Sequence, residues 1–192
     1  MSTTDAAPPL STPLVVGVDL GGTKMAAALV TADGALAGPL ASAPTPARSG
    51  PEAVLDAIAS VVDTVVSAGT HQAPGATVAV SAVGVGSAGV VNVSTGTIVS
   101  ATDAITGWTG TSVATGVRSR LIAQGYGDMP VHVENDVDAY AGGEAWLGAG
   151  RDASSVLVVA VGTGVGGSVV INGATVRGAH YVAGEIGHVP AP

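Results

Sequence analysis

Short apolar runs rich in valine and alanine recur along the chain, and glycine, threonine or acidic residues separate them. Branched side chains in runs of this length are typical of buried strands, and breaks that contain glycine are typical of turns. The pattern predicts strands at 14–18, 25–30, 36–43, 76–86, 130–136, 154–161 and 168–171, and a hairpin at 90–100.

Three segments instead predict helices. Residues 52–68 carry valine, leucine and isoleucine at spacings of three and four, and Pro51 suits the first helical position. Further helices are expected at 111–124 and, in an alanine-rich stretch, at 137–147. This mixture of strands and helices predicts an α/β fold.

The first strand ends at a compact group of polar and small residues. Asp19 stands at the end of the strand, Gly21 and Gly22 are expected to take the positive φ of an abrupt turn, and Thr23 and Lys24 follow. The backbone N–H groups of the two glycines and the threonine can face one point, which suits a phosphate, and Asp19 can hold Mg²⁺ through water. An ordinary hairpin with an exposed aspartate is the alternative.

A second glycine turn repeats this arrangement. Gly162, Thr163 and Gly164 begin a glycine turn over 162–167, between the strands expected at 154–161 and 168–171. The repeat suggests two similar halves that face one nucleotide from opposite sides. The pattern is neither a Walker loop nor a dinucleotide fingerprint, because G-x-x-x-x-G-K-[ST] is absent and a strand, not a helix, follows the first turn.

Polar residues also follow the strand at 130–136. Asn135 and Asp136 stand at its carboxyl end, which is the edge where α/β domains bind ligands. The alternative is that one of them only caps the following helix. On that helix, Asp138 and Glu144 are expected on the solvated face.

Glu185 and His188 are three residues apart near the end of the chain. On one helical turn these side chains would share a face and form part of a site. A surface pair without function remains the alternative.

Composition narrows the class of protein. The 192 residues, 47% hydrophobic, suit one large domain or two small ones. A net charge of −8 with six scattered Lys and Arg argues against a nucleic-acid surface. The absence of cysteine excludes disulfides and thiolate zinc sites and fits a cytoplasmic protein.

No membrane segment is expected. Residues 1–13 lack the basic start and apolar stretch of a signal peptide and are predicted to be a disordered tail. The uncharged stretches 72–102 and 153–176 are interrupted by Gly, Ser, Thr and Asn, which favours strands over a spanning helix.

Five motifs in order resemble the ROK family, which joins bacterial repressors, uncharacterised open reading frames and sugar kinases such as glucokinase, fructokinase and N-acetylmannosamine kinase. The resemblance covers residues 14–190. Its motifs are Gly21-Gly22-Thr23-Lys24, Glu134-Asn135-Asp136, Gly143-Glu144-Ala145 with Gly148-Ala149-Gly150-Arg151, Gly162 to Gly167, and Gly184-Glu185-Ile186-Gly187-His188.

This resemblance implies roles for individual residues. Asp136 resembles the catalytic base of phosphoryl transfer to a sugar hydroxyl. The implied nucleotide contacts are Asp19, Gly21, Gly22, Thr23, Lys24, Gly162, Thr163 and Gly164, with ATP and Mg²⁺ as cofactors. The implied sugar contacts are Gly89, Asp103, Asn135, Glu185 and His188. Asp103 stands where many family members have an asparagine, and Ala88 stands where a proline is frequent. These departures leave the identity of the sugar undetermined.

The resemblance also implies a ribonuclease H-like, actin-like ATPase fold of two lobes. Residues 14–123 are expected to form the first lobe, and 124–192 to start the second. Typical members continue through a cysteine-rich zinc loop, an adenosine-binding segment and a helix that closes the first lobe. The chain therefore resembles a truncated kinase with an incomplete second lobe, and no metal site made of protein ligands is expected. Family members often dimerise, which leaves a homodimer open.

Three functions compete on these grounds. The first is ATP-dependent phosphorylation of a hexose or amino hexose, with polyphosphate as an alternative donor. The second is an inactive fragment or sugar-binding protein. A sugar-responsive repressor is the weakest, because only 13 residues precede the first strand and leave no room for a DNA-binding domain.

Overall fold

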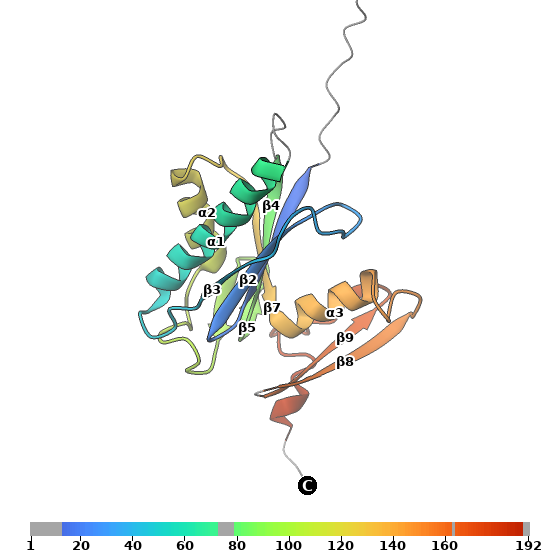
Figure 1. Cartoon of the computed structure of the whole chain (residues 1–192). Coiled ribbons are helices and arrows are strands. Elements are labelled where there is room, and N and C mark those ends of the chain that lie inside the picture. The colour runs from blue at the N-terminus through green and yellow to red at the C-terminus, as the bar shows by residue number, and fades with distance from the viewer. Residues whose placement is uncertain (1–12, 73–78, 163, 190–192) are drawn as a thin grey trace, which may run out of the picture.

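The computed structural model describes residues 13–72, 79–162 and 164–189. A larger and a smaller sheet lie on either side of helix α3 (Asp136–Trp146), as Figure 1 shows. The larger sheet has the strand order β3-β2-β1-β4-β7. Its strands are β1 (Leu14–Leu20), β2 (Lys24–Val30), β3 (Ala41–Pro44), β4 (Val80–Ser87) and β7 (Val131–Asn135).

Parallel pairing brings three strand ends to one edge of this sheet. Strand β1 pairs in parallel with β4, which pairs in parallel with β7, and the last pairs at this edge are Leu20 with Ser87 and Ser87 with Asn135. Strand β2 returns antiparallel to β1. The edge therefore gathers the β1–β2 turn, the loop after β4 and the start of α3.

Large side chains cover one face of the larger sheet. Helices α1 (Pro51–Gln72) and α2 (Val113–Ala123) lie on this face, where alternate residues of the strands are buried with them. Trp108 completes the core, and its indole N–H donates to Ser87 Oγ (3.1 Å) at the end of β4. The bond ties the loop before α2 to the edge just described.

The opposite face of the sheet carries small and acidic residues instead. Gly17, Gly84 and Gly86 alternate with the buried valines of β1 and β4, so α3 can pack against β4 on this side. An added Cβ at Gly86 would lie 3.6 Å from the Cα of Asp136. This is an ordinary van der Waals distance, so the start of α3 packs directly against β4 at Gly86.

The smaller sheet consists of β8 (Ser155–Val161), β9 (Val165–Ile171) and β10 (Ala174–Thr175). Helix α3 packs against β8 and β9. On the other side of β8, Leu157 is 62% exposed and Val161 is 79% exposed. The remaining elements are the hairpin β5 (Val90–Asn92) with β6 (Thr97–Ser100) and the short 3₁₀ helix η1 (Ile186–His188).

Several sequence expectations need correction. The strand expected at 36–43 begins only at Ala41, and Leu36 forms just an isolated bridge with Val30. Gly166 and Gly167 lie within β9 and not in the preceding turn. The larger sheet continues past residue 124, because β7 pairs with β4, so the two sheets divide between β7 and α3.

The remaining strands and helices agree with the α/β prediction to within a few residues at their ends, apart from those outside the described ranges. Most of the expected tail, residues 1–12, lies outside the described residues. No helix in the described part of the chain has the length and apolar character to cross a membrane.

Candidate functional site

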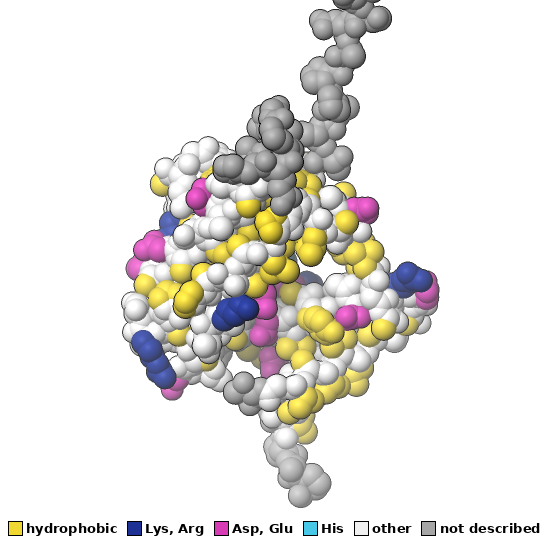
Figure 2. Space-filling model, in the orientation of Figure 1, with side chains coloured by type: hydrophobic (Ala, Val, Ile, Leu, Met, Phe, Trp, Pro, Cys, Tyr) yellow, Lys and Arg dark blue, Asp and Glu magenta, His cyan; other side chains and the backbone are white. Residues whose placement is uncertain are grey.

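A cavity of about 480 Å³ is lined by the two ends of the β5–β6 hairpin, the start of α3, strand β9 and the segment before η1. Its wall includes Gly89, Asn135, Asp136 and Glu185, which were four of the expected site residues. The volume falls within the range of about 300–1,000 Å³ that is usual for ligand pockets. Figure 2 shows acidic side chains in the hollow between the two parts of the molecule.

Asn135 orients this wall through its side-chain amide. The Oδ1 atom accepts hydrogen bonds from the backbone N–H groups of Val137 (2.9 Å) and Asp138 (3.1 Å), so Asn135 is the N-cap of α3. Its Nδ2 group donates to the carbonyl oxygen of Gly89 (3.0 Å). Asn135 therefore caps the helix, and the same side chain is held beside the cavity, so capping does not exclude a role for it in the site.

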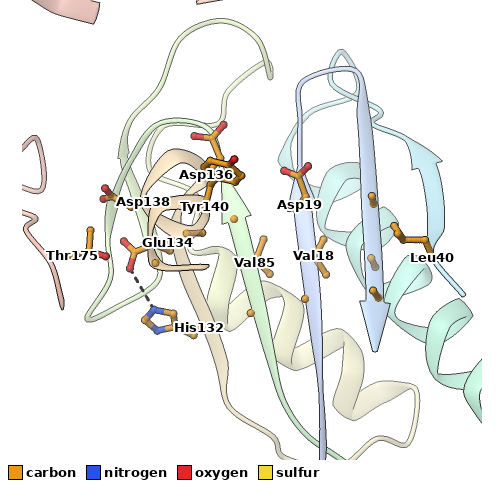
Figure 3. A pocket seen from close by; sticks show the side chains of 18 of the residues that line it. Val18, Asp19, Leu40, Val85, His132, Glu134, Asp136, Asp138, Tyr140 and Thr175 are labelled. Carbon is orange, nitrogen blue, oxygen red and sulfur yellow. Dashed lines mark ion pairs between the residues drawn. The ribbon is translucent and has the colours of Figure 1, made fainter. Parts of the chain in front are cut away.

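Asp136 lies where two cavities meet. It lines the cavity of about 480 Å³ and also a larger one of about 750 Å³ on the small-residue face of the main sheet. Figure 3 shows Asp136 and Asp19 beside this larger cavity, at the start of α3 and the end of β1. Burial raises the pKa of Asp19, and the nearby charge of Asp136 raises it further.

These two carboxylates fit a divalent cation. The charge of Asp136 raises the electrostatic cost of ionising Asp19, and Mg²⁺ is usually held by one or two carboxylates together with water and phosphate oxygens. Among the described residues, no group of three or more His, Cys, Asp or Glu is arranged to hold a metal ion. Asp19 and Asp136 would therefore supply only part of the coordination.

The first glycine turn is closed more tightly than the sequence indicated. The Gly21 N–H donates to the carbonyl oxygen of Lys24 (3.1 Å), so it is not directed outward with its neighbours. Neither Gly21 nor Gly22 has positive φ, which corrects that expectation. Space requires glycine at position 21, because an added Cβ would lie 2.9 Å from the Lys24 carbonyl oxygen, whereas one at Gly22 would make only a tight contact of 3.3 Å with Ala104 Cβ.

Thr45 supports this turn from the residue after β3. Its hydroxyl donates to the carbonyl oxygen of Gly21 (2.7 Å), and its N–H donates to the carbonyl oxygen of Thr23 (2.9 Å). Both bonds use carbonyl oxygens of the turn and fix it to the residue after β3. The N–H groups of Gly22 and Thr23 are the remaining amides of the expected phosphate site.

The second glycine turn is described only in part. The Gly162 N–H donates to the carbonyl oxygen of Gly164 (2.8 Å), whereas Thr163 lies outside the described residues. Convergence of the two turns on one nucleotide stays a prediction.

The other expected sugar contacts have different outcomes. Glu185 immediately precedes η1 and lines the smaller cavity. His188 belongs to η1, but its side chain lies outside the described part of the structure. Asp103 is exposed and does not line this cavity, because Ile105 and Trp108 anchor its loop in the core and Thr102 takes the lining position.

The sequence expectation for Asp138 was wrong. Asp138 is only 7% exposed, because α3 is covered by β4 on one side and β9 on the other, and it accepts a hydrogen bond from the buried Ser168 hydroxyl (2.5 Å). Burial raises the pKa of Asp138. Glu144 is half-buried, and its carboxylate accepts a hydrogen bond from the Ala149 N–H (3.0 Å).

Sequence reasoning also missed a neighbouring ion pair. The Arg177 guanidinium binds the carboxylate of Glu134, which is 8% exposed. The signal available was the position of Glu134 directly before Asn135, but nothing in the sequence identified its partner.

Comparison with known proteins gives a consistent result. The family model described as "ROK family" matches residues 15–192. A glucokinase of Streptomyces coelicolor is 36% identical over 178 residues, which are 92% of this chain and 49% of that protein.

Two solved structures are similar in fold. A ROK hexokinase from Thermus thermophilus has a TM-score of 0.76 at 32% identity and is matched over 93% of this chain and 54% of its own. A ROK family glucokinase from Streptomyces griseus, solved with glucose and AMPPNP, has a TM-score of 0.75 at 34% identity. The match covers 93% of this chain and 51% of the glucokinase chain. The chain thus spans about half the length of these relatives. The expected ribonuclease H-like, actin-like ATPase fold is confirmed, and by sequence and structure the chain belongs to the ROK family.

Proposed function

We propose that this site serves ATP-dependent phosphorylation of a hydroxyl group on a hexose or amino hexose. The observation that carries the proposal is the position of Asp136, whose carboxylate lies beside a sugar-sized cavity and next to Asp19. The glucokinase relative and the glucokinase solved with glucose and AMPPNP support the same class of substrates.

Each part of the site then has a definite role. The sugar occupies the cavity lined by Gly89, Asn135 and Glu185. Asp136 accepts the proton of the attacking hydroxyl, a step that requires only hydrogen-bond reach. Glu185 and the amide of Asn135 orient the sugar.

The phosphate donor is bound on the side of the first glycine turn. The N–H groups of Gly22 and Thr23 and the side chain of Lys24 bind its phosphates, since phosphoryl transfer depends mainly on positioning and charge stabilisation. A magnesium ion held by Asp19 neutralises phosphate charge when bound.

The activity is proposed for a polypeptide of the relatives' length, because this chain matches about half of each. We expect the 192-residue chain alone to turn over poorly, since the outer face of β8 leaves Leu157, Val159 and Val161 exposed and the second lobe lacks cover there. Turnover by this chain near a typical enzyme rate of about 10 s⁻¹ would contradict that expectation.

The decisive experiment compares Asp136→Asn with wild type in a protein extended to the relatives' length. Turnover is measured by a coupled assay of ADP release over a panel of hexoses and amino hexoses. If Asp136 is the general base, Asp136→Asn should turn over about 10²-fold or more slowly than wild type. Asp152→Asn, a change at a carboxylate whose side chain is 92% exposed, serves as the matched control. Near wild-type turnover by Asp136→Asn would refute the mechanism, and a parallel assay with polyphosphate separates the two donors.

A further inference from the structure

Arg177 connects the smaller sheet to the larger one. It follows β10, and its Nε atom donates to Glu134 Oε1 (3.2 Å) and Oε2 (3.1 Å) of β7, while Nη2 donates to Oε2 as well. Paired contacts between guanidinium and carboxylate are stronger and more directional than a single ammonium contact. The ion pair therefore restrains both the distance and the orientation of the two segments.

This ion pair is shielded from water. The Glu134 side chain is 10% exposed and that of Arg177 is 33% exposed, whereas Arg118 and Asp128, which pair within the larger lobe, are 52% and 59% exposed. Removal of one partner of a shielded pair leaves an uncompensated charge, which costs far more than loss of a surface pair. Figure 3 shows Asp138 close to Glu134. Without Arg177, the carboxylate of Glu134 would therefore lie beside a second carboxylate.

The main chain of Arg177 makes a second connection. Its carbonyl oxygen accepts a hydrogen bond from the Ala183 N–H (3.1 Å), which closes the loop 178–183 at its base. The chain then continues through Gly184 to Glu185 at the cavity. Arg177 thus holds the residue that precedes Asn135 with its side chain, and the segment that leads to Glu185 with its backbone.

We propose that Arg177 is a positioning residue that sets the separation between Asn135 and Asp136 on one wall of the cavity and Glu185 on the other. Arg177 does not itself line that cavity. This role rests on the proposed sugar-binding function. Within that function, Arg177 is the residue that keeps the two walls of the sugar site at the correct separation. A sugar that contacts both walls binds tightly only when their separation is correct.

Hydrogen exchange on this chain tests the connection without any ligand. In Arg177→Met and in Glu134→Gln, the amides of residues 183–187 should exchange faster than in wild type, while amides of α1 should not change. Because both changes break the same pair, the double variant should be no worse than either single variant. Unchanged protection of 183–187, or additive losses in the double variant, would overturn the proposal.

Sugar affinity tests the consequence for function. In a protein extended to the relatives' length, calorimetric titration with the hexoses and amino hexoses of the panel should show weaker binding by Arg177→Met, by about ten- to a hundredfold, the loss expected for a misplaced site. Arg177→Lys should fall between wild type and Arg177→Met, because it keeps the charge and loses the paired contact. Arg118→Met, which breaks the exposed pair with Asp128, should bind as wild type does.

The outcomes separate the two proposals. Failure of the wild-type protein, extended to the relatives' length, to bind any sugar of the panel would refute the proposed function, and the exchange measurement on this chain would still decide the role of Arg177. Sugar binding by wild type and Arg177→Met with equal affinity would refute the positioning role alone. Thermal midpoints are measured for every variant, and Arg177→Lys and Glu134→Gln carry the comparison if Arg177→Met does not fold.

Discussion

Asp19 at the end of β1 and Asp136 at the start of α3 approach each other across Gly86 of β4, and their proximity contributes to the raised pKa of Asp19. Burial is the larger cause of this shift, and the charge of Asp136 adds to it. Gly86 lies between them, and an added Cβ there would be in ordinary van der Waals contact with the Asp136 Cα (3.6 Å) and the Val18 carbonyl oxygen (3.8 Å). The fold therefore keeps Asp136 close enough to Asp19 for its charge to disfavour ionisation of the Asp19 carboxyl.

Asp19→Asn should raise the thermal midpoint of this chain at pH 7. A raised pKa means that the folded state favours the protonated carboxyl, so stability is lost as pH rises through the carboxyl range and the ionised form is unfavourable at neutral pH. The advantage of the variant should disappear below about pH 3.8, the ordinary pKa of the group. Thermal unfolding from pH 3 to 8 measures it.

Magnesium provides the control for this prediction. Added Mg²⁺ should raise the midpoint of wild type more than that of Asp19→Asn, because only wild type retains both carboxylates. A pH-independent difference between the two proteins, or equal responses to Mg²⁺, would show that the carboxylates do not form one site.

Asn135→Ala should destabilise the chain more than Asp136→Ala. Asn135 caps α3 through two backbone N–H groups, and loss of such a cap costs about 1 kcal/mol. Within the described residues, Asp136 accepts a side-chain hydrogen bond from the neighbouring Val137 N–H alone. Urea unfolding of both variants measures the difference in the free energy of unfolding. A larger loss of stability for Asp136→Ala would indicate that Asp136, not Asn135, is the more important cap.

Gly89→Ala should weaken both the fold and the cavity wall. Gly89 has φ of 103°, and an added Cβ would lie 2.7 Å from the backbone carbonyl oxygen of Ser100. Strain of this kind costs about 1–3 kcal/mol. Because the Gly89 carbonyl oxygen accepts from Asn135, relaxation of the loop should also release the Asn135 amide.

Measurement of Gly89→Ala combines urea unfolding with sugar titration. Gly50→Ala is the matched control, since Gly50 also has positive φ (85°) and nothing lies within 4 Å of its added Cβ. Both variants carry backbone strain, but only Gly89→Ala should lose sugar affinity. Equal losses of sugar affinity in the two variants would show that Gly89 has no specific role in sugar binding.

The sequence predicted this fold well where the pattern of one segment decides its structure. The valine runs, the hairpin at 90–100 and the apolar stripe after Pro51 all appear as expected. The predicted site residues Asn135, Asp136 and Glu185 also line one cavity. Each of these predictions rests on local periodicity or on an ordered motif.

The misses concern contacts that no periodicity or motif in the sequence reports. Asp138 has the spacing of a surface residue on its own helix, and only the packing of α3 between two sheets buries it. Likewise, the sequence identified Gly21 as a turn residue but attributed it to positive φ, whereas the requirement comes from the Lys24 carbonyl oxygen. The pairing of Arg177 with Glu134 spans 43 residues, and no local pattern reports it.

Asp138→Asn is expected to raise the thermal midpoint at pH 7. Burial is the main cause of the raised pKa of Asp138, and the charges of Glu134 and Glu185 add to it, against the opposing effects of the Ser168 hydrogen bond and Arg177. The ionised carboxylate therefore costs stability at neutral pH, and this cost vanishes as pH falls below about 3.8, the ordinary pKa of the carboxyl.

The Asp138→Asn change keeps a side-chain oxygen that accepts from the Ser168 hydroxyl, so the hydrogen bond survives while the charge is removed. Asp138→Ala removes both, and the unsatisfied buried hydroxyl should cost about 1–3 kcal/mol. Thermal unfolding of wild type and both variants at pH 3 and pH 7 distinguishes the charge from the hydrogen bond. A lower midpoint for Asp138→Asn at pH 7 would mean that Arg177 needs the Asp138 charge as a second partner, and that repulsion from Glu134 is the smaller effect.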